Sequence, residues 1–122
     1  MFPFVLAAAC VAWHGDVVGH YINQVVSIGA QGAETWIEET PAGLAGRYVL
    51  HEDGRNVNGT LVPMGDTQDC STALFRWQDV YGEGWLKLHF FPAQHCFEGY
   101  WGLERLDPAL LYSSCVRTPA TS

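Results

Sequence analysis

The chain has few positive charges, which excludes several classes of partner. Only six of its 122 residues are Lys or Arg, against thirteen Asp or Glu, and the formal net charge is -7. The six basic residues are dispersed along the chain and form no run. Nucleic acids and anionic lipid surfaces attract clustered Lys and Arg. We therefore expect no nucleic-acid partner, and a membrane association only through a lipid anchor.

The chain also lacks the sequence motifs of common catalytic and metal sites. It contains no G-x-S-x-G elbow, no phosphate-binding P-loop and no dinucleotide fingerprint. It has no C-x-x-C pair, and its histidines do not follow a metal-ligand spacing. We expect no cofactor and no metal, and exposed surface positions for most of the histidines, which are His14, His20, His51, His89 and His95.

Helical periodicity is nearly absent, and strands take its place. A short helical turn is expected only at 107–111, where Asp107 can cap and Pro108 can occupy the first turn. Elsewhere short β-rich runs alternate with turns that hold most of the 13 Gly and 6 Pro residues. The predicted strands are 20–28, 34–39, 47–52, 59–63, 73–80, 85–91 and 97–103.

The short connections between these runs determine the expected fold. Sequential strands joined by tight turns become antiparallel neighbours, and a twisted sheet with an apolar face has to close to bury that face. We predict an all-β fold, an antiparallel up-and-down meander of about seven to eight strands closing into a small barrel. The barrel domain is placed at residues 13–106, and residues 107–122 form a C-terminal tail.

A glycine two residues before an aromatic ring recurs near predicted strand starts. The three instances are Gly19-His20-Tyr21, Gly46-Arg47-Tyr48 and Gly99-Tyr100-Trp101. The pattern resembles the calycin barrels of the lipocalin and avidin type, whose first strand opens with Gly-x-Trp; here Tyr21 replaces Trp. The resemblance covers roughly residues 19–103 and implies a barrel. No ligand residue of that family can be matched, so none is carried over.

The first twelve residues carry no charge and predict export. An apolar run followed by small residues is typical of a secretory signal, although no Lys or Arg precedes the run. A buried first strand is the alternative. The sequence Ala8-Ala9-Cys10 also fits a lipoprotein signal with Cys10 as the acylated residue, although Ala7 occupies a position where Leu is more common. We expect a secreted or periplasmic protein, or a lipoprotein anchored through Cys10.

The four cysteines suggest one disulfide. If the hairpin made by 73–80 and 85–91 turns around Glu83, Cys70 and Cys96 face each other at its open end, within bonding distance. Free thiols and a metal site with His89 and His95 are the alternatives. A bridge would agree with an oxidising compartment. Cys115 is then either a free thiol in the tail or a partner of Cys10.

Aromatic residues are the main candidates for a binding site. Five Trp in so small a domain supply flat apolar walls and one donor each, which suits small-molecule or sugar recognition. Asp79 shares a strand face with Trp77 and Tyr81, where it can bond the turn backbone or act as an acid. The candidate ligand-binding residues are Trp36, Tyr48, Trp77, Asp79, Trp85 and Trp101.

We expect a non-catalytic role, in which the barrel binds a small hydrophobic or sugar-like ligand or a protein partner. One alternative is an enzyme of calycin-like shape in which Asp79, or a histidine such as His51 or His89, serves as acid or base. The other is an envelope lipoprotein tethered through Cys10.

Overall fold

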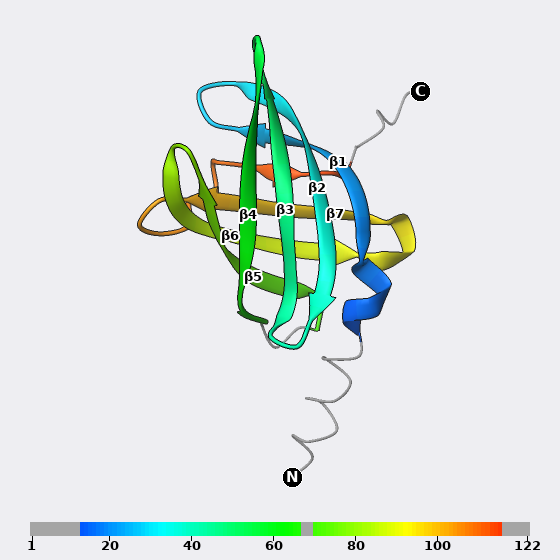
Figure 1. Cartoon of the computed structure of the whole chain (residues 1–122). Helices are drawn as coiled ribbons and strands as arrows, with labels where there is room; N and C mark the ends of the chain where they lie inside the picture. The colour runs from blue at the N-terminus through cyan, green and yellow to red at the C-terminus, as the bar shows by residue number, and fades with distance from the viewer. Residues whose placement is uncertain (1–12, 67–69, 116–122) are drawn as a thin grey trace.

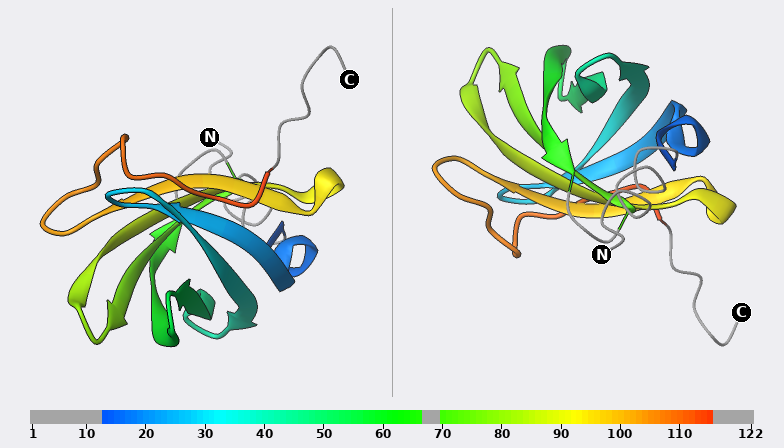
Figure 2. Two further views of the ribbon diagram at one scale, coloured as in Figure 1. Left: turned by 90° about the horizontal axis from the view of Figure 1, so that it is seen from above. Right: turned by 90° about the horizontal axis from the view of Figure 1, so that it is seen from below.

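The computed structural model describes residues 13–66 and 70–115 and has the predicted all-β architecture. Eight strands form one antiparallel sheet in the order β7-β6-β5-β4-β3-β2-β1-β8, which curls into a nearly closed barrel (Figures 1 and 2). The elements are η1 (Trp13–Val17), β1 (Gly19–Val26), β2 (Ala30–Thr40), β3 (Gly43–Glu52), β4 (Arg55–Asp66), β5 (Thr72–Asp79), β6 (Gly82–Phe91), η2 (Pro92–Gln94), β7 (Cys96–Gly102) and β8 (Tyr112–Ser113).

All seven predicted strands are present, and β2, β3, β4 and β6 are longer than predicted. The extra residues lie beside tight turns: Thr40 pairs with Gly43 around one turn, and Glu52 pairs with Arg55 around another. The sequence prediction ended these strands early because their ends carry polar residues and glycine. In the barrel the polar side chains at these ends reach solvent, so the backbone continues to pair.

The last strand, β8, is missing from the prediction and closes the barrel. It pairs with β1 through Val25 and Tyr112, and the amide of Ser114 donates to the carbonyl of Phe97 on β7. The sheet therefore extends to Ser113, beyond the predicted boundary at 106. The expected helical turn at 107–111 is a single β-turn, in which the amide of Leu110 donates to the carbonyl of Asp107.

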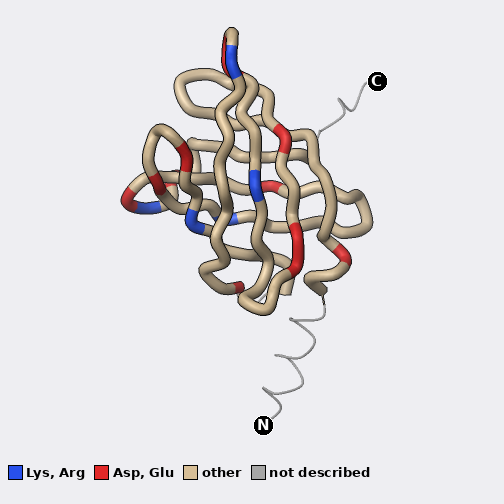
Figure 3. The backbone as a smooth tube through the Cα atoms, in the orientation of Figure 1, with Lys and Arg blue, Asp and Glu red and all other residues tan. Residues whose placement is uncertain are grey.

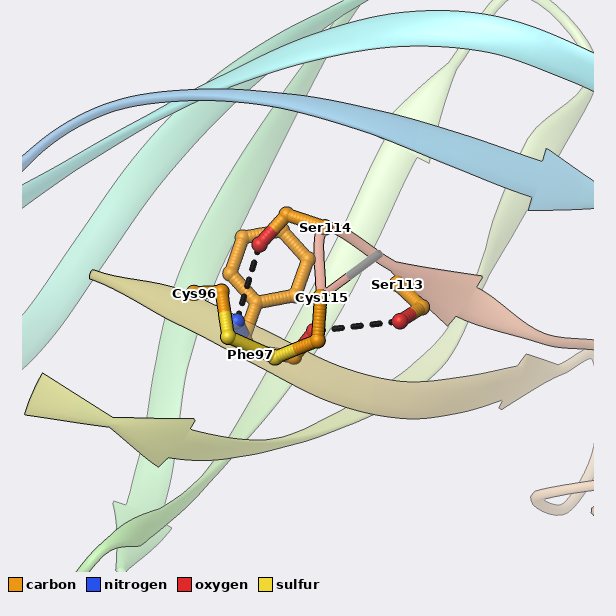
Figure 4. Close-up of a disulfide and its surroundings, with 5 residues drawn as sticks. All are labelled: Cys96, Phe97, Ser113, Ser114 and Cys115. Carbon is orange, nitrogen blue, oxygen red and sulfur yellow. Dashed lines mark hydrogen bonds between the residues drawn. A yellow bond between two sulfur atoms is a disulfide. The ribbon is translucent and has the colours of Figure 1, made fainter. Parts of the chain in front are cut away.

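The predicted Cys70–Cys96 disulfide is wrong: Cys96 bonds Cys115, with 4.9 Å between their Cα atoms (Figure 4). The predicted pairing assumed a hairpin turn around Glu83, whereas the turn lies at 80–81 and Thr72 faces His89. Cys96 therefore begins β7, on the side of β6 away from β5, and cannot face position 70.

The bridge stabilises the seam of the barrel, where β7 and β8, the two edge strands of the sheet, come together. Beside it, the Oγ of Ser114 accepts a hydrogen bond from the amide of Phe97 at 2.8 Å, and the Oγ of Ser113 donates to the carbonyl of Phe97 at 3.2 Å (Figure 4). No described cysteine is free. The predicted lipidation site, Cys10, lies outside the described residues.

The buried core includes the half of the barrel interior next to η1. Val17 of η1 is fully buried there, and the hydroxyl of Tyr21 donates to its carbonyl. The rings of Phe75, Phe90 and Phe97 are at most 1% exposed. No helix within residues 13–66 and 70–115 is long and apolar enough to cross a membrane.

Candidate ligand-binding cavity

A cavity of about 380 Å³ lies in the barrel interior at the end away from η1. This end is formed by the last residues of β1, β3, β5 and β7, at the upper left of Figure 1. The volume falls within the range of pockets that hold small organic molecules. The lining comprises aromatic rings (Tyr48, Trp77, Tyr81, Trp101, Tyr112), aliphatic groups (Val25, Leu50, Leu61, Leu86, Leu103) and polar groups (Ser27, Gln31, Glu52, Asp79).

The ring of Tyr48 forms one wall because its neighbour on β4 is glycine. Tyr48 on β3 pairs with Gly59 on β4. A Cβ at Gly59 would lie 2.0 Å from the Tyr48 ring, so only glycine leaves room for the ring to lie flat against the sheet. The ring crosses β4, and its hydroxyl donates to the Oδ2 of Asp79 on β5 at 2.6 Å. Burial and this hydrogen bond raise the pKa of Tyr48, which stays neutral.

Trp77 forms the adjacent wall in the same way, because its neighbour on β6 is also a glycine. It pairs with Gly84 on β6, where a Cβ would lie 2.7 Å from the indole. The indole crosses β6, and its Nε1 donates to the carbonyl of Gly102 on β7 at 3.2 Å. Trp101 packs edge-on against it, with ring centroids 5.8 Å apart, and donates to the carbonyl of Val26 at 2.9 Å. Both indole N–H groups are thus satisfied by the barrel wall.

Asp79 combines the turn role with a position on the cavity wall. Its Oδ1 accepts the amide of Tyr81 at 2.8 Å, the Asx contact expected at this turn. Its Oδ2 accepts the hydroxyl of Tyr48. Both donors are neutral, and a carboxylate has about four lone-pair sites. Asp79 therefore retains capacity to accept a hydrogen bond from a ligand.

The rim of the cavity carries a second carboxylate. Tyr81 donates its hydroxyl to Glu52 at 2.5 Å, and Arg55 donates to the Tyr81 oxygen at 2.7 Å. Arg55 also reaches Glu52 at 3.3 Å. The hydrogen bond from Tyr81, followed by that from Arg55, lowers the pKa of Glu52, so Glu52 is charged at neutral pH. This network joins the β3–β4 and β5–β6 hairpins across the barrel mouth.

A buried polar cluster lies beside Tyr112 at the inner side of the cavity. The Oγ1 of Thr35 donates to the Oδ1 of Asn23 at 2.8 Å and bonds the hydroxyl of Tyr112 at 2.5 Å. Each of the three residues is less than 5% exposed. Burial raises the pKa of Tyr112. The cluster ties β1, β2 and β8 together where the barrel closes.

Four of the six predicted ligand-binding residues line the cavity: Tyr48, Trp77, Asp79 and Trp101. Trp36 and Trp85 do not. They lie on the outer face, where the guanidinium of Arg47 stacks on Trp36 at 4.0 Å and that of Arg76 on Trp85 at 4.6 Å. The alternation of side chains along a strand indicates the outward position of Trp85, since Trp85 lies between the inward positions 84 and 86.

Several lining residues were not among the predicted ligand-binding residues. Glu52 could have been found from alternation, because it shares a strand face with Tyr48, whereas Tyr81 lies in the turn after β5. Tyr112 belongs to a two-residue strand with no pattern of its own. Ser27 and Gln31 flank the β1–β2 turn, and their approach to the cavity depends on how the barrel closes.

Asp79, His51 and His89 do not meet in one cleft. His51 lies on the outer face and bonds Glu34 at 2.8 Å, and His89 bonds the Oγ1 of Thr72 at 2.7 Å. Neither lines the cavity that contains Asp79. No group of three or more His, Cys, Asp or Glu that could hold a metal ion occurs within the described residues. An acid–base mechanism in this cavity would therefore depend on the carboxylates and tyrosines among its described lining residues.

A second hollow of about 280 Å³ lies beside η1. It contains His14, which is 5% exposed and bonds the Oδ2 of Asp66 through Nε2 at 2.6 Å. The rest of its described lining comes mainly from the turn at 40–43 and the end of β4, and none of these described residues is Trp, Tyr or Phe. It lacks the aromatic walls of the larger cavity.

Comparison with protein families, curated proteins and solved structures finds no significant match.

Proposed function

We propose that this protein is an exported β-barrel that binds a small, largely apolar ligand in the open-end cavity without catalysing a reaction on it. The observation that carries the proposal is the cavity of about 380 Å³, whose walls are the rings of Tyr48, Trp77 and Trp101. Such rings supply large apolar contact areas with little loss of side-chain freedom on binding. The wall is held in place by hydrogen bonds before a ligand arrives, which lowers the cost of binding.

The cavity suits binding better than catalysis because its polar groups are already hydrogen-bonded to other groups of the barrel. The Asp79 carboxylate and the Tyr48 hydroxyl bond each other, and the indole N–H groups bond backbone carbonyls. General acid–base catalysis requires an acid or base poised to exchange a proton with the substrate. Burial keeps Tyr48 and Tyr112 protonated by raising their pKa, which makes them poor bases at neutral pH.

Export is supported by the Cys96–Cys115 disulfide, which agrees with an oxidising, extracytoplasmic compartment. The secretory signal proposed for residues 1–12 and the lipid anchor proposed at Cys10 lie outside the described residues. They remain predictions that mass spectrometry of the N-terminus would test.

The experiment uses N-phenyl-1-naphthylamine, a neutral dye whose fluorescence rises in apolar surroundings. We expect a saturable rise with one dye per chain and a Kd in about the micromolar range. Leu50→Trp places an indole in the cavity and should abolish binding. Val49→Trp, one residue earlier on the outer face, is the matched control and should bind as the native protein does.

Near-ultraviolet circular dichroism would confirm that both variants are folded. No saturable rise with the native protein would refute the proposal. A dye that binds Leu50→Trp as tightly as Val49→Trp would also refute it, because the dye would then bind elsewhere.

A further inference from the structure

The charged groups that line the cavity are all acidic. Glu52 and Asp79 are the carboxylates, and none of the described residues that line the cavity is Lys, Arg or His. An apolar cavity for a purely hydrophobic ligand has no use for two carboxylates, since partial burial of a charge costs free energy unless it is paired. These groups need an explanation beyond apolar binding.

Asp79 is the stronger of the two anchors. The hydrogen bonds it accepts come from the Tyr81 amide and the Tyr48 hydroxyl, which orient the carboxylate without neutralising it. Glu52 already has a cationic neighbour, because Arg55 reaches it at 3.3 Å. A ligand group that bonds Asp79 would therefore be a donor, and a positively charged donor gives the strongest bond.

The rings beside Asp79 favour the same ligand group. Trp77 and Asp79 lie on one face of β5, Tyr81 follows in the β5–β6 turn and also lines the cavity, and Tyr48 bonds the carboxylate itself. Aromatic faces attract cations as well as apolar groups, and indole does so best. A cation at Asp79 would have a carboxylate on one side and aromatic rings around it.

The charge around the barrel mouth acts in the same direction. The strand ends and loops there carry six carboxylates (Glu52, Asp53, Asp79, Glu83, Glu104 and Asp107) against three guanidinium groups (Arg55, Arg76 and Arg105), and Arg76 lies 3.5 Å from Glu83; Figure 3 colours the acidic and basic positions along the chain. The excess negative charge attracts cations toward the opening and repels carboxylates.

We propose that the ligand is an organic amine, with an apolar body between Trp77, Trp101 and Leu50 and a protonated ammonium group at Asp79. This rests on the proposed function and adds the ligand's charge to it. An ammonium group has three N–H donors, enough for Asp79 and for Glu52 or a water at the rim. An isosteric carboxylic acid would place a negative charge beside Asp79 and is excluded.

The test compares three ligands with one skeleton: 4-phenylbutylamine, 4-phenylbutanol and 4-phenylbutanoate. Isothermal titration at pH 7 and low salt measures their affinities. We expect the amine to bind about tenfold more tightly than the alcohol, the usual gain for a hydrogen bond to a charged group, and the carboxylate to bind most weakly. The difference between amine and alcohol should shrink as salt is added.

Two variants distinguish a direct bond to Asp79 from the general attraction of the negative charges around the barrel mouth. Asp79→Asn keeps an acceptor for the Tyr81 amide and should lower the amine affinity about tenfold, with the alcohol affinity unchanged within about twofold. Asp53→Asn removes the same charge from the tip of the β3–β4 hairpin, outside the cavity lining, and should change the amine affinity less than twofold. Binding of the neutral dye checks that both variants retain the cavity.

The outcomes distinguish this inference from the proposed function. If the alcohol binds as tightly as the amine while the neutral dye still binds, the amine inference is wrong and the proposed function stands. Equal weakening of amine and alcohol by Asp79→Asn would show a structural role only and would also overturn the inference. If neither the dye nor any of the three ligands binds, both fail.

Discussion

The two halves of the barrel interior use aromatic residues in opposite ways. Next to η1, the rings of Phe90 and Phe97 pack against each other with centroids 5.9 Å apart, and both residues, like Phe75, are at most 1% exposed. At the open end, Tyr48 and Trp77 lie flat along the wall, each over a glycine on the next strand, and leave about 380 Å³ empty.

The difference lies in the neighbouring strand rather than in the hydrophobicity of the rings. Gly59 and Gly84 allow the rings to cross the sheet surface and bond a group one strand further on, Asp79 and the Gly102 carbonyl. Glycine opposite an aromatic residue therefore produces a wall, and a side chain at that position would push the ring into the interior. Aromatic rings can therefore either fill the barrel interior or line a cavity in it, depending on the residue opposite them.

The largest expected effect compares core truncations in the two halves. Phe90→Ala should lower the free energy of unfolding by about 3–5 kcal/mol, because it leaves a cavity in a packed region. Leu50→Ala, at the open end, should cost less than about 1.5 kcal/mol, because the side chain is only partly buried and borders an existing cavity. Urea unfolding measures both. Equal losses would contradict the contrast between the halves.

The disulfide should stabilise the barrel without shaping the cavity. Replacing Cys96 and Cys115 together by Ser opens a loop with a sequence separation of 19 and should lower the free energy of unfolding by about 3 kcal/mol. Cys96 lies at the start of β7, at the η1 end, so the affinity for the neutral dye should change less than about twofold. A large loss of dye binding in the folded variant would show that the seam, and not the glycine-backed wall, maintains the cavity.

Gly59 tests the wall directly. Gly59→Ala places a methyl group 2.0 Å from the present position of the Tyr48 ring, which has to move into the cavity. We expect a loss of about 1–3 kcal/mol of stability from overpacking and weaker dye binding. Gly32→Ala is the matched control in a strand, since no heavy atom lies within 4 Å of a Cβ at Gly32. Unchanged dye affinity in folded Gly59→Ala would refute the role of this glycine.

A pH-dependent effect reports on the packed half. Burial raises the pKa of Tyr21 from 10.0 to about 12, so the folded protein holds this proton more tightly than the unfolded chain. Its contribution is fully present below pH 10 and is lost as the pH rises from 10 to 12. Urea unfolding from pH 8 to 12 should show this decline, and Tyr21→Phe should make it shallower. An identical decline in Tyr21→Phe would contradict the assignment.

Alternation along the chain predicted the strands and much of the site. It placed Trp77 and Asp79 on one face, and it separated Trp85 from Leu86, which identifies Trp85 as an outer-face residue. Turn chemistry between the runs indicated a meander, and the meander indicated a barrel. These features depend only on residues that are close together in the chain, so they can be predicted from the sequence.

Register and closure could not be predicted in the same way. A shift of the β5–β6 turn from Glu83 to 80–81 changes every cross-strand pair, and this alone removed the predicted Cys70–Cys96 contact. β8 is two residues long and exists because it pairs with β1, a strand that is far from it in the sequence. The cavity depends on both, because its size is set by which ring faces which glycine.

The five indole N–H groups provide the most direct test of a cavity at the open end alone. In two-dimensional ¹H–¹⁵N spectra titrated with the neutral dye, the account predicts that the Trp77 and Trp101 signals shift and saturate together. The signals of Trp13, which is buried in η1, and of the outer-face Trp36 and Trp85 should stay in place. Shifts at Trp13, Trp36 or Trp85 with none at Trp77 and Trp101 would contradict it.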